Sequence, residues 1–211
     1  MPQKIIIVRH GETDWNFEHA MQGQKDVPLN WQGFLQAQEA AGKLVNEEID
    51  IIFSSDSKRA HQTAMTIARG IKKEIILTPH LRERCFGELE GMAFGVPTKL
   101  VPWITAREEF HARLNATSWI HREFKIETNE EMNERIKKFK KEHLQKFKNK
   151  NVLLVSHGGL IGLLLVTLGV DLEFVKGKNI QNAEIFVLVK KKGGYRLGNL
   201  GNLGNKGNKG V

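Results

Sequence analysis

The sequence predicts an α/β protein, a three-layer αβα sandwich with a mostly parallel central sheet and a helical cap insertion. Short apolar runs rich in β-branched residues alternate with amphipathic segments at the spacing of strand and helix units. Three of these strands end in charged or imidazole residues, and ligands gather at the carboxyl ends of strands in such sheets. With 211 residues, 40% of them hydrophobic and 27% charged, the chain has an ordinary globular composition and can bury a sizeable core.

The first predicted strand and helix lie within the first 45 residues. Residues 4–8 (KIIIV) form an apolar run that leads into Arg9-His10-Gly11, which is typical of a buried strand entering a turn. Asn30 is expected to cap a helix that ends near Val45. At helical spacing, the predicted inner face of this helix consists of Phe34, Ala37, Ala41 and Leu44.

Two further strands enclose a second helix. Residues 49–53 form an apolar strand closed by Ser54-Ser55-Asp56, and residues 57–70 are expected to be helical. A third short strand spans 74–77 and ends before Pro79. The inner face of the second helix is predicted at Ala60, Ala64, Ile67 and Ala68.

Residues 92–131 depart from this alternation and hold five of the chain's sixteen aromatic residues. We interpret them as a helical insertion that caps the strand ends, where substrate choice is usually made. The alternative is a satellite core beneath a loop. Beyond this segment, strands are expected at 152–155 and 185–189, after a basic amphipathic helix. The apolar stripe of that helix is Met132, Ile136, Phe139 and Phe147.

These elements predict one domain over residues 1–192, followed by a tail. Residues 193–211 contain seven glycines and a near-repeat of Gly, Asn and Lys. Because they lack the apolar surface needed to order themselves, we expect residues 193–211 to form a tail that is disordered after about Leu197.

Residues 152–170 carry no formal charge over 19 positions, about the length of a bilayer span. Ser156-His157-Gly158-Gly159 interrupts the run, which favours a buried strand, a Gly-rich turn and a buried helix over a membrane span. The first ten residues hold an apolar run too short for a signal peptide. Cys85 is the single cysteine, so no internal disulfide can form, and a reducing, cytoplasmic location is expected.

The formal net charge of +8 is concentrated in two segments. Residues 135–150 contribute +7 and residues 190–211 contribute +6, so the rest of the chain carries about −5. A nucleic-acid or anionic-membrane partner would have to use these two segments alone, and basic helices are usually solvated faces. We therefore do not expect nucleic acid as a partner, and a homo-oligomer is left open.

Two arginines and two histidines follow predicted strands and are expected at the same edge of the sheet. They are Arg9, His10, Arg59 and His157. A guanidinium group pairs two phosphate oxygens at once and keeps its charge at any working pH. A neutral imidazole beside it can attack phosphorus. Gly11 and Gly158 allow the backbone to approach a ligand, and a helix that begins near Gly158 would direct free N–H groups at an anion. These features indicate a phosphate site, and the sequence offers no clustered set of metal ligands.

Five sequence blocks, in order and correctly spaced over roughly residues 4–190, carry a family resemblance. They are Arg9-His10-Gly11-Glu12-Thr13 with Asn16, then residues 22–29 (QGQKDVPL), then Ser54-Ser55-Asp56 with Arg59-Ala60 and Thr63-Ala64, then Leu81-Arg82-Glu83-Arg84 with Gly87 and Glu90-Gly91, and finally Val155-Ser156-His157-Gly158-Gly159. In these blocks the chain resembles the histidine phosphatase superfamily, which includes the cofactor-dependent phosphoglycerate mutases. A lone Arg-His-Gly would be weak evidence, but five ordered blocks are specific.

The resemblance implies a reaction without metal or cofactor, in which His10 is the nucleophile and becomes phosphohistidine. Arg9, Arg59 and His157 would hold the phosphoryl oxygens. Glu83 would protonate the leaving oxygen and then deprotonate the attacking water, a role for which Glu90 competes. The implied substrate-binding set is Gly11, Asn16, Gln22, Gly23 and Gly158.

Departures from the family pattern favour a phosphatase over a mutase. In the mutases the acidic block continues to a tyrosine, where this chain has Phe86, and paired arginines grip the substrate carboxylate, whereas residues 92–131 contain no Arg-Arg pair. We therefore expect a histidine acid phosphatase-type hydrolase that acts on a small phosphorylated metabolite. The alternatives are a phosphoglycerate mutase and a catalytically silent relative that only binds phosphorylated ligands.

Overall fold

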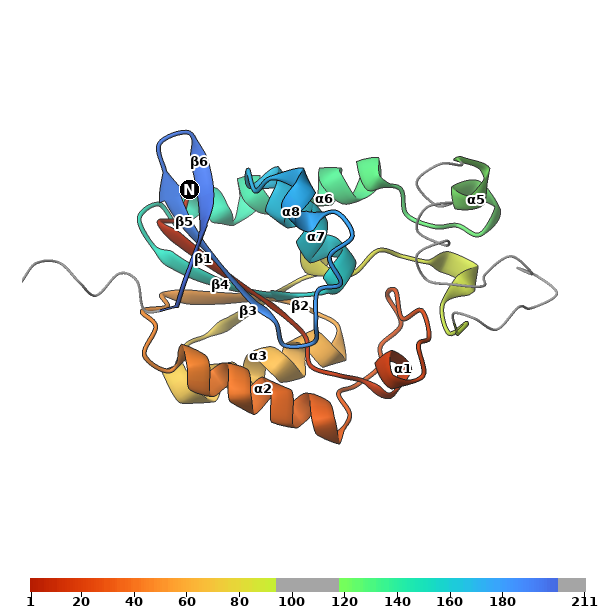
Figure 1. The fold of residues 1–211 in the computed structure, drawn as a ribbon, viewed down its shortest axis with the longest axis horizontal. Coiled ribbons are helices and arrows are strands. Elements are labelled where there is room, and N and C mark those ends of the chain that lie inside the picture. The colour runs from red at the N-terminus through yellow and green to blue at the C-terminus, as the bar shows by residue number, and fades with distance from the viewer. Residues whose placement is uncertain (94–117, 201–211) are drawn as a thin grey trace, which may run out of the picture.

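The computed structural model describes residues 1–93 and 118–200, and within these residues a six-stranded mixed sheet forms the centre of the molecule (Figure 1). Its strands are β1 (Lys4–Arg9), β2 (Ile51–Ser55), β3 (Ile75–Thr78), β4 (Asn151–Ser156), β5 (Ile185–Lys191) and β6 (Gly194–Gly198). They are ordered β3-β2-β4-β1-β5-β6. The first four are parallel, whereas β5 and β6 are antiparallel to their neighbours.

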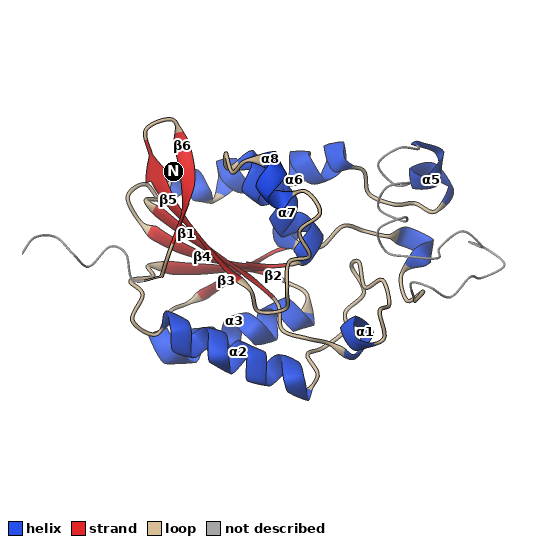
Figure 2. Ribbon diagram, in the orientation of Figure 1, coloured by secondary structure: helices blue, strands red, loops and turns tan. Residues whose placement is uncertain are grey.

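Helices cover both faces of this sheet, which confirms the predicted three-layer fold (Figure 2). On one face lie α2 (Trp31–Leu44) and α3 (Lys58–Ile71). On the other lie α6 (Asn129–Glu142) and α7 (Gly158–Thr167). The shorter helical segments are α1 (Asp14–Phe17), α5 (Ser118–Glu123), α8 (Leu172–Val175) and the 3-10 turns Pro79–Leu81, Gly87–Leu89 and Leu144–Lys146.

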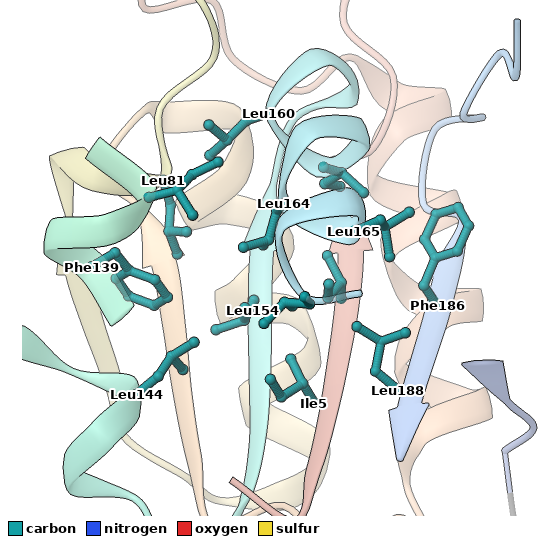
Figure 3. Packing of buried hydrophobic residues seen from close by; sticks show 14 of the residues in the cluster. Ile5, Leu81, Phe139, Leu144, Leu154, Leu160, Leu164, Leu165, Phe186 and Leu188 are labelled. Carbon is teal, nitrogen blue, oxygen red and sulfur yellow. The ribbon is translucent and has the colours of Figure 1, made fainter. Parts of the chain in front are cut away.

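Alternate residues of the central strands feed two separate cores, one on each face of the sheet. Ile5 and Ile7 pack in the core that contains α6 and α7, whereas Ile6 and Val8 pack in the core that contains α2 and α3. Figure 3 shows the first of these cores, where Phe139 lies against the sheet. Burial on both faces explains why these strands read as continuous apolar runs.

The predicted strands and the helices at 30–45 and 57–70 match the structure to within two residues at their ends. The basic helix is shorter than predicted, because α6 ends at Glu142 and Phe147 lies beyond it, after the 3-10 turn Leu144–Lys146. Asn30 caps α2, because its side-chain oxygen accepts a hydrogen bond from the N–H of Gly33 at 2.8 Å. The predicted inner face of α3 is buried throughout. The uncharged run at 152–170 forms β4 and the ten-residue α7, and in the described part of the chain no helix is long and apolar enough to cross a bilayer.

The prediction that Phe34 faces the core is wrong. Phe34 is 36% exposed, and the buried residues of α2 are Gly33, Ala37, Ala40 and Leu44. A methyl group on Gly33 would lie 2.0 Å from the carbonyl oxygen of Glu12. Close packing of α2 on the turn that follows β1 therefore sets the rotation of this helix and directs Phe34 outward.

The prediction of a tail beginning at 193 needs correction. Gly194–Gly198 forms β6, which pairs antiparallel with β5. Tyr195 anchors this strand, since its ring is buried and its hydroxyl donates to the carbonyl of Pro2 at 2.6 Å. Gly193 and Gly194, at φ 92° and 148°, supply the turn that the strand requires. The remainder of the predicted tail, 201–211, lies outside the described residues.

Most of the predicted cap insertion, 94–117, also lies outside the described residues. The described end of the segment is helical in α5 and in the first turn of α6. It packs in a small cluster apart from the two main cores, which contains Met21, Phe86, Leu89, Ile120, Phe124 and Ile126. This end of the segment therefore contributes to a satellite core, the alternative interpretation given above.

Candidate active site

The register of the central strands brings the two histidines together. Arg9 is the register partner of Ser156 in the parallel β1–β4 pair, so the next residues, His10 and His157, leave the sheet side by side. The His10 N–H donates to the carbonyl of Ser156 at 2.9 Å. The two imidazole rings are buried, with their centroids 5.1 Å apart.

One ring nitrogen of His10 is committed to a backbone hydrogen bond. Nδ1 lies 2.7 Å from the carbonyl oxygen of Gly11. Since a carbonyl oxygen only accepts, Nδ1 must carry the proton, and Nε2 of the neutral ring keeps a lone pair. Burial, and then the charges of Arg59 and Arg9, hold the pKa of His10 well below its usual 6.5. The ring is thus neutral at working pH, and the lone pair of its Nε2 is available for nucleophilic attack.

His157 faces the same space from the start of α7. Its Nε2 lies 2.9 Å from Oγ of Ser55 and 3.3 Å from Oγ of Ser57. Its buried Nδ1 has no hydrogen-bond partner among the described residues. Burial, followed by the charge of Arg59, also holds the pKa of His157 well below 6.5.

The pKa directions of these two histidines predict a loss of stability in mild acid. The unfolded chain binds protons at imidazole as the pH falls below about 6.5, whereas the folded protein does not, so stability present above that pH is lost below it. Between pH 6.5 and 5.5 the two rings together should lower the free energy of unfolding by about 2 kcal/mol.

Urea unfolding at both pH values measures this loss. The His10→Gln variant, which lacks one titrating ring, should lose about 1 kcal/mol less than the wild type over the same interval. An equal loss in the two proteins would contradict the assignment of a neutral, buried His10.

Arg59 is held in place by backbone oxygens at the start of α3. It is 1% exposed, and its two terminal nitrogens donate to the carbonyls of Lys25 and Gly23, each at 2.7 Å. Its Nε has no partner in the described part of the chain. Burial lowers the pKa of Arg59 to about 10, against the opposing charge of Glu83, so the group stays positive at neutral pH.

Arg9 lies between the two histidine segments. Its guanidinium donates to the carbonyl of Ile180 at 2.6 Å. A methyl group on Gly158 would lie 3.6 Å from Nε of Arg9, which is an ordinary van der Waals contact, so Arg9 sets no steric need for glycine at this position. The structure therefore brings together Arg9, His10, Arg59 and His157, as the sequence predicts.

Glu83 occupies the amino end of α7. Its carboxylate accepts hydrogen bonds from the N–H groups of Gly159 at 2.9 Å and Leu160 at 3.0 Å. The first-turn N–H groups of α7 were expected to face phosphate; two of them instead bind this side chain, because a carboxylate is stabilised at a helix amino end. The carboxylate thereby joins the site from a loop that is remote in sequence.

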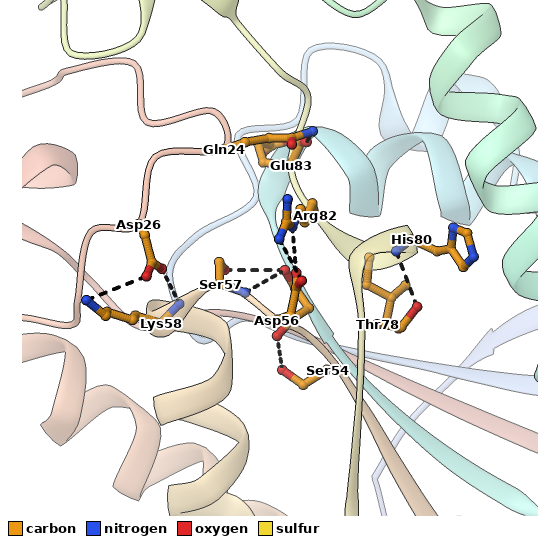
Figure 4. Close-up of polar contacts among 12 residues, drawn as sticks. Gln24, Asp26, Ser54, Asp56, Ser57, Lys58, Thr78, His80, Arg82 and Glu83 are labelled. Atoms are coloured by element: carbon orange, nitrogen blue, oxygen red, sulfur yellow. Dashed lines mark hydrogen bonds and ion pairs between the residues drawn. The ribbon is translucent and has the colours of Figure 1, made fainter.

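Two ion pairs fix the loop that carries Glu83. Arg82 forms a two-point pair with Asp56 at 2.6 and 2.7 Å (Figure 4). Arg135 of α6 pairs with Glu127 at 2.7 Å and donates to the carbonyls of Arg82 at 2.9 Å and Glu83 at 3.3 Å. The backbone on both sides of the carboxylate is therefore anchored to other elements.

Glu90, the sequence competitor of Glu83, has a different role. Its Oε1 accepts from the N–H groups of Gln24 at 2.8 Å and Phe86 at 3.0 Å. A methyl group on Gly23 would lie 2.1 Å from this oxygen. Glu90 therefore ties two loops together, and Gly23, at φ 51°, makes room for it while its carbonyl holds Arg59.

The expected role of Gly11 in admitting a ligand needs correction. A methyl group on Gly11 would lie 2.3 Å from the carbonyl oxygen of Gly33, so the space above its Cα is filled by α2. The Gly11 N–H donates to Oγ1 of Thr63 at 3.1 Å, and its carbonyl accepts from His10. Gly11 therefore orients the ring of His10.

Two further predicted residues lie beside the turn after β1. Asn16 uses its side-chain oxygen to accept from the N–H of Thr13 at 3.2 Å. Gln22 is buried, and its Oε1 has no partner among the described residues. Both side chains retain polar atoms available to a ligand.

Sequence reasoning missed Ile180, Asn182 and Ala183, which contact Arg9 and His10. The carbonyl of His10 accepts from the N–H of Ala183 at 3.2 Å and from Nδ2 of Asn182 at 3.1 Å. Because β5 is antiparallel to β1, its amino end lies at the carboxyl edge of the parallel strands. A parallel β5 would place its amino end at the opposite edge of the sheet, so the sequence analysis did not include this segment in the site.

Gly159 lies close to Glu83, so a substitution at Gly159 is expected to change the activity without changing the stability. A methyl group on Gly159 would lie 2.6 Å from Oε1 of Glu83, so Gly159→Ala should displace the carboxylate. Alanine is favoured over glycine within helices by about 1 kcal/mol, which offsets the strain. We expect kcat to fall about 10- to 100-fold while the unfolding free energy changes little.

Steady-state kinetics and urea unfolding of Gly159→Ala test this expectation. The matched control is Gly162→Ala in the same helix, where the added methyl group would only touch Val175 at 3.4 Å. Equal activity of the two variants would show that the position of Glu83 is unimportant.

The fold and the site together define a class of phosphoryl-transfer protein, in which a neutral imidazole nucleophile is surrounded by guanidinium groups at the carboxyl edge of an α/β sheet. The model of the histidine phosphatase superfamily (branch 1) matches residues 5–203. The chain therefore belongs to the histidine phosphatase superfamily.

Relatives with curated names and solved structures agree with this assignment. A protein of Hydrogenobacter thermophilus named after phosphoserine phosphatase activity is 31% identical over 193 residues, which is 87% of each chain. The metal-independent phosphoserine phosphatase of Arabidopsis thaliana is 32% identical over 160 residues, 75% of this chain and 65% of that protein. A structure of phosphoserine phosphatase from Entamoeba histolytica with phosphoserine is 26% identical at a TM-score of 0.75, covering 96% of this chain and 98% of that one.

Proposed function

We propose that this protein is a metal-independent phosphomonoester hydrolase that acts on a small phosphorylated metabolite through phosphohistidine at position 10. The observation that carries the proposal is the hydrogen bond from Nδ1 of His10 to the Gly11 carbonyl, which leaves Nε2 as the nucleophile beside Arg9, Arg59 and His157. The guanidinium groups supply fixed positive charge where phosphoryl transfer needs it most.

In the first step, Nε2 of His10 attacks phosphorus, and the bond from phosphorus to the ester oxygen breaks. Glu83 enters this step protonated and gives its proton to the departing oxygen, which leaves as an alcohol, and the N–H groups of Gly159 and Leu160 bind the carboxylate that remains. Arg9, Arg59 and His157 bind the equatorial oxygens and spread the charge of the transition state. The product of this step is phosphohistidine.

In the second step, water attacks the same phosphorus from the side that the alcohol has left. The carboxylate of Glu83 accepts a proton from the water, and the phosphorus–nitrogen bond breaks to release inorganic phosphate. His10 returns as a neutral ring, still donating from Nδ1 to Gly11. Glu83 is again protonated and ready for the next substrate.

Hydrolysis is favoured over mutase activity by the residues present, whereas the relatives carry names of both kinds. Phe86 stands where the mutases have a tyrosine, and residues 92–131 lack the paired arginines. The relatives described above are named for phosphoserine hydrolysis. A silent, ligand-binding relative would lack a catalytic group, whereas all five candidates are in the chain and converge on one site.

The proposal extends to the location of the protein and to its assembly. The single cysteine supports a reducing, cytoplasmic compartment, and a small phosphorylated metabolite fits a site built for one phosphoryl group. A homo-oligomer is compatible with this site, because the five catalytic candidates all come from one chain.

Hydrolysis of p-nitrophenyl phosphate in excess chelator tests the proposal. We expect full turnover with chelator present, and faster turnover of some member of a panel of phosphoserine, sugar, nucleotide and glycerate phosphates. A parallel assay for conversion of 3-phosphoglycerate to 2-phosphoglycerate tests the mutase alternative. Absence of turnover on the whole panel, or isomerisation faster than hydrolysis, would overturn the proposal.

A further inference from the structure

The turn before β5 makes a polar contact that links the nucleophile to Asn16. Nδ2 of Asn182 lies 3.1 Å from the carbonyl oxygen of His10 and 3.1 Å from Oδ1 of Asn16. We propose that Asn182 is a positioning residue, which holds the amide of Asn16 at a fixed distance from His10 so that Asn16 binds the phosphoryl group. The inference rests on the proposed function.

The orientation of both amides follows from their partners. The backbone N–H of Thr13 can only donate, so the Asn16 atom 3.2 Å from it must be oxygen. Asn182 then faces two acceptors, this oxygen and the His10 carbonyl, and its nitrogen must use both hydrogens on them. The link from His10 to Asn16 therefore has one consistent direction of donation.

This arrangement leaves the other end of Asn16 ready for a ligand. Its Oδ1 accepts from the N–H of Thr13, the hydroxyl of Thr13 and Nδ2 of Asn182. Its own Nδ2 makes no hydrogen bond to another described residue, and its two hydrogens match the oxygens of a phosphoryl group.

The helix that carries Asn16 needs an anchor of this kind. α1 is one turn long, and none of its four residues is buried. Its position therefore depends largely on polar contacts, such as the hydrogen bond from Asn182 to Asn16. The bridge through Asn182 fastens it to the backbone of the nucleophile, and a shift of about 1 Å in a catalytic donor can cost about 100-fold in rate.

The test measures kcat and KM for p-nitrophenyl phosphate in Asn182→Ala, in Asn16→Ala and in the double variant. Asn182→Ala should lower kcat about 10- to 100-fold and change KM less than about threefold. In the Asn16→Ala background the same substitution should cost less than about threefold, because the group that it positions is already gone.

Two further variants separate positioning from shape. Gln181→Ala is the matched control, since this exposed amide donates to the Asn179 carbonyl at 2.8 Å and should leave the rate unchanged. Asn182→Asp keeps the shape of the side chain but places a carboxylate oxygen against the His10 carbonyl and Oδ1 of Asn16, which are both acceptors. This variant should lose at least as much kcat as the alanine variant. Full activity of Asn182→Asp, or an equal loss on both Asn16 backgrounds, would overturn the inference.

Calorimetric binding of vanadate keeps the inference testable apart from turnover. Vanadate resembles the phosphoryl group in the transition state of its transfer. Asn182→Ala should therefore weaken vanadate binding about tenfold when Asn16 is present, and should change it little in the Asn16→Ala background. Wild-type protein that binds vanadate without turning over substrate would reject the proposed function alone. Unchanged vanadate affinity in Asn182→Ala would reject the positioning role alone.

Discussion

Replacement of His10 by alanine is expected to lower kcat by at least about 10,000-fold and to abolish the phosphoenzyme. The two-step route has no other group to accept the phosphoryl group, and removal of a nucleophile leaves only binding and charge stabilisation. Stopped assays with p-nitrophenyl phosphate give the rate, and acid-labile phosphate on the protein gives the intermediate.

The matched control for this variant is His61→Ala, which removes an imidazole from α3. It should retain wild-type activity. A His10→Ala protein that folds and keeps more than about one per cent of the rate would show that another residue attacks phosphorus, and the proposed route would then be wrong.

Replacement of Arg59 by alanine is expected to lower kcat/KM about 1,000-fold. The guanidinium lies beside both histidines and remains charged despite burial, with its pKa lowered only to about 10. The variant should also lose at least about 2 kcal/mol of stability, because the carbonyls of Gly23 and Lys25 lose their donors.

Arg59→Lys separates these two effects. It restores a positive charge but cannot span both carbonyls and the ligand, so it should recover less than about a tenth of the activity. Arg69→Ala, an exposed arginine in the last turn of the same helix, is the control and should have little effect on either quantity. A fully active Arg59→Lys would show that charge alone is needed at this position.

The sheet and its flanking helices could be predicted because apolar residues report burial directly. The strand with Ile5 to Val8 is apolar on both faces, and only a covered sheet explains that pattern. The same pattern places Arg9, His10 and His157 at the ends of neighbouring strands. These three site residues are therefore visible in the sequence.

The rest of the site depends on contacts that leave no periodic signal. Asn182 reaches His10 because β5 reverses direction, and strand direction cannot be read from an apolar run. Gly11 was expected to face a ligand, but the absence of a side chain does not say which neighbour fills the space. Tyr195 is a single aromatic residue in a glycine-rich segment, so the sequence predicts a tail where the structure has β6.

For Glu83, the sequence indicates the role but not the contacts that hold the side chain in place. The family resemblance implies its role, but only the structure shows that its carboxylate is bound by the first turn of α7. The ion pairs that hold its loop join residues that are 26 and 8 positions apart, Arg82 with Asp56 and Arg135 with Glu127. Such pairs cannot be distinguished in sequence from ordinary surface charges.

The most direct measurement is to quench the wild-type enzyme during turnover of a ³²P-labelled phosphomonoester and to locate the label. The account predicts one acid-labile, alkali-stable phosphoryl group on the imidazole of His10, formed and lost fast enough to lie on the route to inorganic phosphate. Steady turnover with no label at His10, or with the label on another residue, would contradict it.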